Sequence, residues 1–135
     1  MKIPSFSSDT IFSEDILSVS LVGSINFCRY KWNPFNTDLE MRKVSNNEWR
    51  KLIFLEGKDK NFSGKYSLRV VINHNPRKQL KSNAMTNRVW DLEFSEFGGI
   101  GTNVNFELEN DQLVEFIFKN DLMNLECKAI NVETE

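Results

Sequence analysis

Apolar and polar residues alternate along much of the chain with the two-residue period of a β-strand. The clearest segment is Tyr66–Ile72, within "GKYSLRVVINHNP". There, every second residue from Tyr66 onward is apolar and lies on one face, whereas Ser67 and Arg69 lie on the other. Similar patterns predict further strands at Ile16–Val22, Leu39–Val44, Trp49–Leu55, Val104–Leu108, Leu113–Lys119 and Leu125–Val132.

Polar turn sequences such as "SNNE", "GKDKNFSG" and "ENDQ" separate these strands. About seven short strands at this spacing predict an all-β fold, namely an immunoglobulin-like antiparallel β-sandwich. A small β-barrel is the main alternative, because it has the same alternation along each strand.

One helix is predicted, in the longest connection, Asn73–Thr102. Asn75 is a helix-capping residue type, Pro76 suits the first helical turn, and "RKQLK" (Arg77–Lys81) follows. A connection this long is unusual in a compact domain unless it has a structure or a function of its own.

The chain length of 135 residues fits one domain. Residues 1–14 are Ser-rich and weakly patterned, so we expect an N-terminal arm there and a single β-sandwich domain over residues 15–135. The composition, with 40% hydrophobic and 27% charged residues, is that of an ordinary globular protein. The net charge of -2 argues against a nucleic-acid partner, since nucleic-acid binders normally carry a basic excess.

The sequence contains few residues in patterns typical of catalytic or metal-binding sites. The only histidine, His74, lies in the turn "NHNP", and the two cysteines, Cys28 and Cys127, belong to no CxxC or Cys/His cluster. No GxSxG motif is present. We therefore expect no metal, no cofactor and no enzymatic activity. The N-terminus does not resemble a secretory signal and no segment is long and apolar enough to span a membrane, so we expect a cytoplasmic protein without a membrane partner.

The tryptophans are more informative. Trp49 opens an alternating strand and is predicted to be a core residue. Trp32, in "YKWNPF", and Trp90, in "RVWDLEF", are flanked by loop residues. A tryptophan in a loop can form an exposed platform on which a sugar ring stacks, or it can pack beneath the loop. The sequence pattern leaves both alternatives open.

The order of several motifs resembles the early-set immunoglobulin-like carbohydrate-binding modules. These include the glycogen-binding domain of AMP-activated kinase β subunits and the N-terminal modules of pullulanases and branching enzymes. The resemblance covers about Ile16 to Val132 and supports the fold expected from the strands. The motifs are "LVGSINF" (Leu21–Phe27), "WNPF" (Trp32–Phe35), "LEM" (Leu39–Met41), "EWRKLIFL" (Glu48–Leu55), "GKYSLRVVIN" (Gly64–Asn73), "GTNVNFEL" (Gly101–Leu108) and "LVEFIFKND" (Leu113–Asp121).

The resemblance implies a stand-alone, non-catalytic module that binds an α-glucan oligosaccharide by aromatic stacking. Trp32 matches the family's loop tryptophan, and Arg69 stands at the position of its strand lysine. The turn departs from the family pattern, because His74 replaces a glycine and Pro76 stands where a second tryptophan is expected. Trp90 is then the candidate for that second platform, after an insertion.

The same departure supports a second hypothesis. Related folds also serve without a sugar ligand, so the alternative function is a protein–protein interaction or scaffolding domain. Its partner is another protein or a second copy of the chain, bound through an exposed sheet face or edge.

Overall fold

The computed structural model describes residues 16–23, 39–75, 79–86, 89–95 and 104–130. These residues contain nine β-strands, and no helix is found among them. None of the described segments is a helix long and apolar enough to cross a membrane. The strands are β1 (Val19–Gly23), β2 (Arg42–Ser45), β3 (Glu48–Leu55), β4 (Lys65–Ile72), β5 (Gln79–Thr86), β6 (Val89–Ser95), β7 (Val104–Glu107), β8 (Gln112–Lys119) and β9 (Asn124–Ala129).

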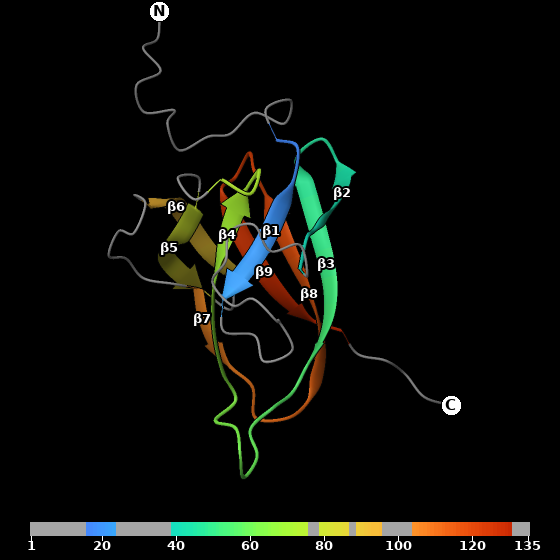
Figure 1. The fold of residues 1–135 in the computed structure, drawn as a ribbon, viewed down its shortest axis with the longest axis vertical. Coiled ribbons are helices and arrows are strands. Elements are labelled where there is room, and N and C mark those ends of the chain that lie inside the picture. The colour runs from blue at the N-terminus through green and yellow to red at the C-terminus, as the bar shows by residue number, and fades with distance from the viewer. Residues whose placement is uncertain (1–15, 24–38, 76–78, 87–88, 96–103, 131–135) are drawn as a thin grey trace, which may run out of the picture.

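All strand pairs are antiparallel and form an all-β sandwich, which confirms the predicted fold class. Hydrogen bonds connect the strands in the order β1-β4-β5-β6-β9-β8-β3-β2, and β7 also pairs with β4. This path folds over at the β5–β6 hairpin. One layer therefore contains β1, β4 and β7, and the other contains β6, β9, β8, β3 and β2 (Figure 1).

The opposite side of the sandwich is closed by one continuous segment that changes layers. At its start, the Met41 amide donates to the Val19 carbonyl of β1 (2.7 Å), and the Leu21 amide donates to the Leu39 carbonyl (3.0 Å). Directly afterwards the chain leaves β1, and β2 pairs with β3 in the other layer. Leu39 and Met41 are both buried, so this segment contributes two side chains to the core.

The core lies between the two layers and is built from the inward-facing residues of both. In β4, alternation buries Tyr66, Leu68, Val70 and Ile72, as the sequence predicts. Trp49 of β3 is also buried, which confirms its predicted place in the core. The facing layer contributes, among others, Ile53, Leu55, Trp90, Leu92, Val114, Phe116, Phe118 and Leu125.

The predicted helix is wrong. Its final residues, from Gln79 to Lys81, begin β5, where Leu80 is fully buried and pairs with Val70 of β4. This non-local pairing outweighs the local capping signal at Asn75, because it buries an apolar side chain and gives backbone N–H and C=O groups hydrogen-bond partners. The long predicted connection thus contains the β5–β6 hairpin, and nine strands replace the expected seven.

The seven strands predicted from the alternation pattern are all confirmed, with shifts at their ends. The largest shifts are of three residues. β1 is predicted from Ile16 but begins at Val19, β2 is predicted from Leu39 but begins at Arg42, and β9 is predicted to end at Val132 but ends at Ala129. The expected N-terminal arm, residues 1–14, lies outside the described residues.

Gly23 ends β1 at a point where the backbone of β4 approaches closely. A Cβ atom on Gly23 would lie 2.6 Å from the Leu68 Cα and in conflict with the Ser67 carbonyl oxygen. Because both are parts of the β4 backbone, neither can move aside as a flexible side chain would. The pairing of β1 with β4 therefore requires glycine at this position.

We expect Gly23→Ala to lower the free energy of unfolding by about 1–3 kcal/mol, because the methyl group forces β1 away from β4. Denaturant unfolding measures the change. Ser45→Ala, at an exposed position of β2, is the control and is expected to stay within about 0.5 kcal/mol of the parent protein. Equal stability of the two variants would contradict the close approach.

Candidate functional site

The structure corrects the prediction for Trp90. This residue lies in β6 opposite Leu125 of β9, and only 2% of its surface is exposed. Its ring packs 5.9 Å from the ring of Phe106, measured between centroids. A ring enclosed in this way has no open face on which a sugar could stack. Trp90 is therefore a core residue and not an exposed platform.

The signal for this placement was present in the sequence. Trp90 and Leu92 alternate with Asp91 and Glu93, as expected for a strand with one buried face. Trp90 and Leu92 are both buried, whereas Asp91 is exposed. Trp32, the other predicted platform, lies outside the described residues.

Arg69 lies on β4 opposite Val22 of β1. It is half-buried, and it occupies the face opposite Tyr66 and Leu68, as the alternation predicts. Its neighbours on that outer face, Val22 and Val71, are buried. The part of the face around Arg69 is therefore not an open platform, and a ligand would reach Arg69 from the more exposed end of β4.

That more exposed end carries a groove over the ladder between β4 and β7, with a volume of about 390 Å³. The volume is within the range typical of small-ligand sites. Three register pairs form the described lining of this β4–β7 groove, and no single stretch of sequence contains them. They are Lys65 with Glu107, Tyr66 with Phe106 and Ser67 with Asn105.

The outward-facing residues of the groove are polar. Lys65, Asn105 and Glu107 are exposed, and Ser67 is half-buried. Together they offer an ammonium group, a hydroxyl, an amide and a carboxylate, which can both donate and accept hydrogen bonds. One positive and one negative charge cancel, so the groove suits a neutral polar ligand better than a strongly charged one.

An aromatic cluster lies directly beneath this groove and supports it. Tyr66 and Phe106 stack at 5.3 Å, and Phe62 meets Tyr66 edge-on at the same distance between ring centroids. Phe106 also packs against Phe116 of the other layer, at 5.8 Å. These contacts join β4 and β7 to the core, so the backbone that forms the groove is held in a defined position.

Tyr66 has a second role at the groove's base. Its phenol donates a hydrogen bond to the Glu56 carbonyl oxygen at 2.7 Å, which ties β4 to the segment after β3. Burial, together with the nearby charge of Glu56, raises the pKa of Tyr66 to about 12, so the phenol stays protonated and remains a donor at neutral pH.

His74 lies in a tight turn after β4, as predicted. Both Asn73 (φ 56°) and His74 (φ 52°) adopt left-handed backbone conformations. The Asn73 Oδ1 accepts hydrogen bonds from the Leu17 and Ser18 amides, and His74 Nε2 lies 3.1 Å from Glu40 Oε1. Among the described residues, no cluster of three or more His, Cys, Asp or Glu side chains is placed to hold a metal.

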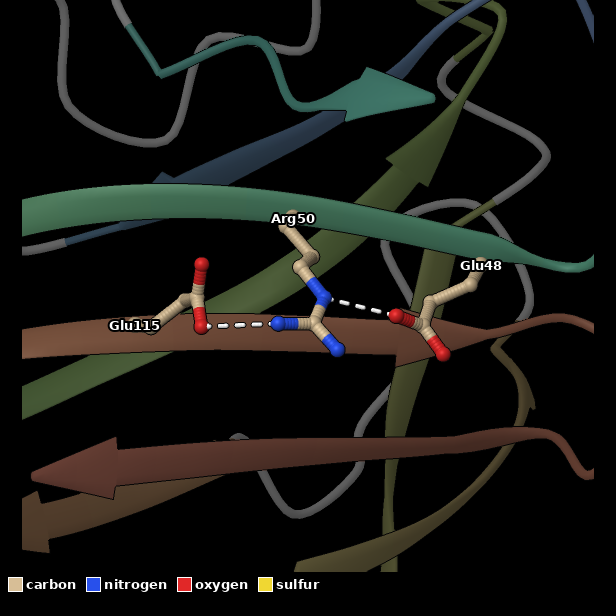
Figure 2. Close-up of polar contacts among 3 residues, drawn as sticks. All are labelled: Glu48, Arg50 and Glu115. Atoms are coloured by element: carbon tan, nitrogen blue, oxygen red, sulfur yellow. Dashed lines mark hydrogen bonds and ion pairs between the residues drawn. The ribbon is translucent and has the colours of Figure 1, made fainter. Parts of the chain in front are cut away.

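A separate charged network lies on the outer face of the layer that contains β3 and β8. Figure 2 shows Arg50 of β3 between Glu48 of the same strand and Glu115 of β8. The distances are 2.6 Å from Arg50 Nε to Glu48 and 3.1 Å from Arg50 Nη1 to Glu115. The hydrogen bond to Glu48 raises the pKa of the guanidinium. This partly exposed network fastens β3 to β8 and leaves no uncompensated positive charge on Arg50.

Comparison with known proteins shows similarity in structure but not in sequence. No family model matches the chain, and no curated protein matches it. A pullulanase from Bacillus acidopullulyticus is similar in structure, with a TM-score of 0.52 and 12% sequence identity. The match covers 86% of this chain but 15% of the pullulanase chain. At this identity the similarity supports the β-sandwich fold and does not transfer an activity.

The raised pKa of Tyr66 predicts a loss of stability at high pH. Because its pKa is raised in the folded state, from 10.0 to about 12, the unfolded chain releases the proton first. The free energy of unfolding is therefore unaffected below pH 10 and decreases as the pH rises from 10 towards about 12.

Denaturant unfolding at about pH 9 and about pH 11 tests this effect. We expect the parent protein to lose more stability between the two pH values than Tyr66→Phe, which lacks the phenol at this buried position. At about pH 9 the variant should be less stable by about 0.5–1.5 kcal/mol, because the bond to Glu56 is missing. Identical pH dependence of both proteins would contradict the assignment.

Proposed function

We propose that the chain is a non-enzymatic, early-set immunoglobulin-like module that binds carbohydrate of the α-glucan type. The observation that carries this proposal is the groove over β4 and β7, which combines polar side chains of no net charge with the stacked aromatic pair Tyr66 and Phe106. The structural similarity to a chain named pullulanase, an enzyme name that denotes pullulan as the substrate, is consistent with it.

Sugar hydroxyls act as both donors and acceptors, so they match a lining that contains both kinds of group. Ser67 and Asn105 face each other across the ladder and can contact one hydroxyl from two sides, while Lys65 and Glu107 contact its neighbours. Arg69 follows two positions after Ser67 on the same face of β4, so it is placed to contact a ligand at that end of the groove.

The buried tryptophan changes the mode of binding that we propose. Since Trp90 cannot stack on a sugar, polar contacts in the β4–β7 groove provide the binding free energy from the described part of the chain. We therefore expect modest affinity, because each hydrogen bond to a neutral hydroxyl replaces one made to water.

We expect maltoheptaose or soluble glycogen to bind the parent protein and Asn105→Ala to weaken binding by about tenfold, through loss of the amide contacts. Isothermal titration calorimetry is the suitable measurement, because a buried Trp90 is a poor fluorescence reporter. Lys65→Ala should weaken binding as well.

Asn110→Ala and Lys128→Ala are matched controls at exposed positions outside the groove, and neither should alter binding. Absence of binding by the parent protein at millimolar sugar would refute the proposed function. Binding that all four variants retain would place the sugar elsewhere and refute the β4–β7 groove alone.

A protein–protein interaction function remains the second candidate, and a separate surface favours it. Leu52 and Phe54 of β3 are 54% and 57% exposed. They lie on the outer face of the layer that contains β3 and β8, whereas the groove lies over β4 and β7 of the other layer. Neighbouring large apolar side chains that stay exposed commonly mark interaction sites.

A further inference from the structure

Strand β3 extends beyond the end of its neighbour β2. The pairing between them ends at Arg42 and Arg50, because the segment before Arg42 turns away to pair with β1. From Lys51 to Leu55, β3 has β8 on one side. On its other side, no strand of the described part of the chain pairs with it. Figure 1 shows this lower half of β3 at the border of the sheet.

This open edge, Lys51–Leu55, is unusually apolar. Its sequence is "KLIFL", and its two outward-facing residues are the exposed Leu52 and Phe54. Alternate residues of an edge strand direct N–H and C=O groups away from the sheet, where another strand can pair with them. Natural edge strands are commonly blocked by charge, as β2 is by Arg42 and Lys43, whereas Leu52–Leu55 contains no charged residue.

We propose that the open edge pairs with the same edge of a second copy of this chain. Two antiparallel strands related by a two-fold axis form an isologous interface, in which each copy contributes the same residues. With the axis at Ile53, Leu52 of each copy lies opposite Phe54 of the other. The two exposed apolar residues then cover each other on one face of a continuous sheet.

The charges that flank the edge favour this occupant. Arg42, Arg50 and Lys51 lie at one end, and Glu56 follows at the other. In this register Glu56 of each copy arrives at the level of Arg50 of the other, where β2 ends with Arg42, so opposite charges meet twice. Arg50 is already bound to Glu48 and Glu115, so the exposed Arg42 is the cation that faces Glu56. A peptide with charge of one sign would complement only one end.

The oligomeric state as a function of protein concentration tests the proposal directly. We expect a reversible monomer–dimer equilibrium in sedimentation velocity experiments. Phe54→Lys should raise the dimer dissociation constant by about tenfold or more, since it places a charge at the centre of the apolar contact. Leu122→Lys is the matched control, because Leu122 is 61% exposed but lies in the turn between β8 and β9, and it should not change the dissociation constant.

A charge exchange tests the identity of the occupant and the direction of pairing. Arg42→Glu and Glu56→Arg should each weaken the homodimer, because each creates two contacts between like charges. An equimolar mixture of the two variants should form a heterodimer of nearly parental affinity, since both contacts are then between opposite charges. Far-UV circular dichroism confirms that each variant is folded.

A parent protein that is monomeric at the highest attainable concentration would overturn the proposal, even if it captures an extended apolar peptide. A dimer unaffected by Phe54→Lys would also overturn it, because the interface would then lie elsewhere. If Phe54→Lys disrupts the dimer but the mixture is no stronger than either variant alone, the antiparallel pairing about Ile53 is wrong.

Discussion

The pairing of β4 with its neighbours is the interaction on which the rest of the sandwich depends. β4 is hydrogen-bonded to β1 along one edge, and to β5 and β7 in succession along the other. Its inner face contributes Tyr66, Leu68, Val70 and Ile72 to the core. Because β5 leaves this edge to pair with β6, β4 also determines where the hydrogen-bonded path passes from one layer to the other.

The same arrangement explains why the two candidate surfaces occur where they do. β7 reaches only the first half of β4, and the outward residues of that short ladder stay accessible and line the groove. The second half of β4 faces β1, where Val22 and Val71 are buried. In the other layer, β2 pairs with β3 only as far as Arg50, because the segment before Arg42 pairs with β1 instead. Among the described residues, no strand pairs with the remaining apolar edge of β3. Both surfaces therefore arise where a strand ends before its partner.

The errors in the sequence-based prediction share a physical cause. Asn75 and Pro76 favour a helix locally, and "QLKSNAMT" has weak strand character, interrupted by the β-bulge between Ser82 and Ala84. The pairing of Leu80 with Val70 outweighs these local preferences. Without β5, its partner β6 is not predicted either, and Trp90 stays open as an exposed platform or a packed residue although Asp91 and Leu92 continue a strand-like alternation.

The sequence by itself determined the all-β class and the approximate positions of seven strands, because a buried strand face requires alternation that is visible locally. It also placed Arg69 on the outer face of β4 and His74 in a turn. Only the tertiary structure decided that β7 pairs with β4, that Trp90 is enclosed by the core and that no strand of the described residues pairs with one side of β3 from Lys51 to Leu55. These features depend on contacts between residues far apart in the chain, and no local pattern specifies which strands become neighbours.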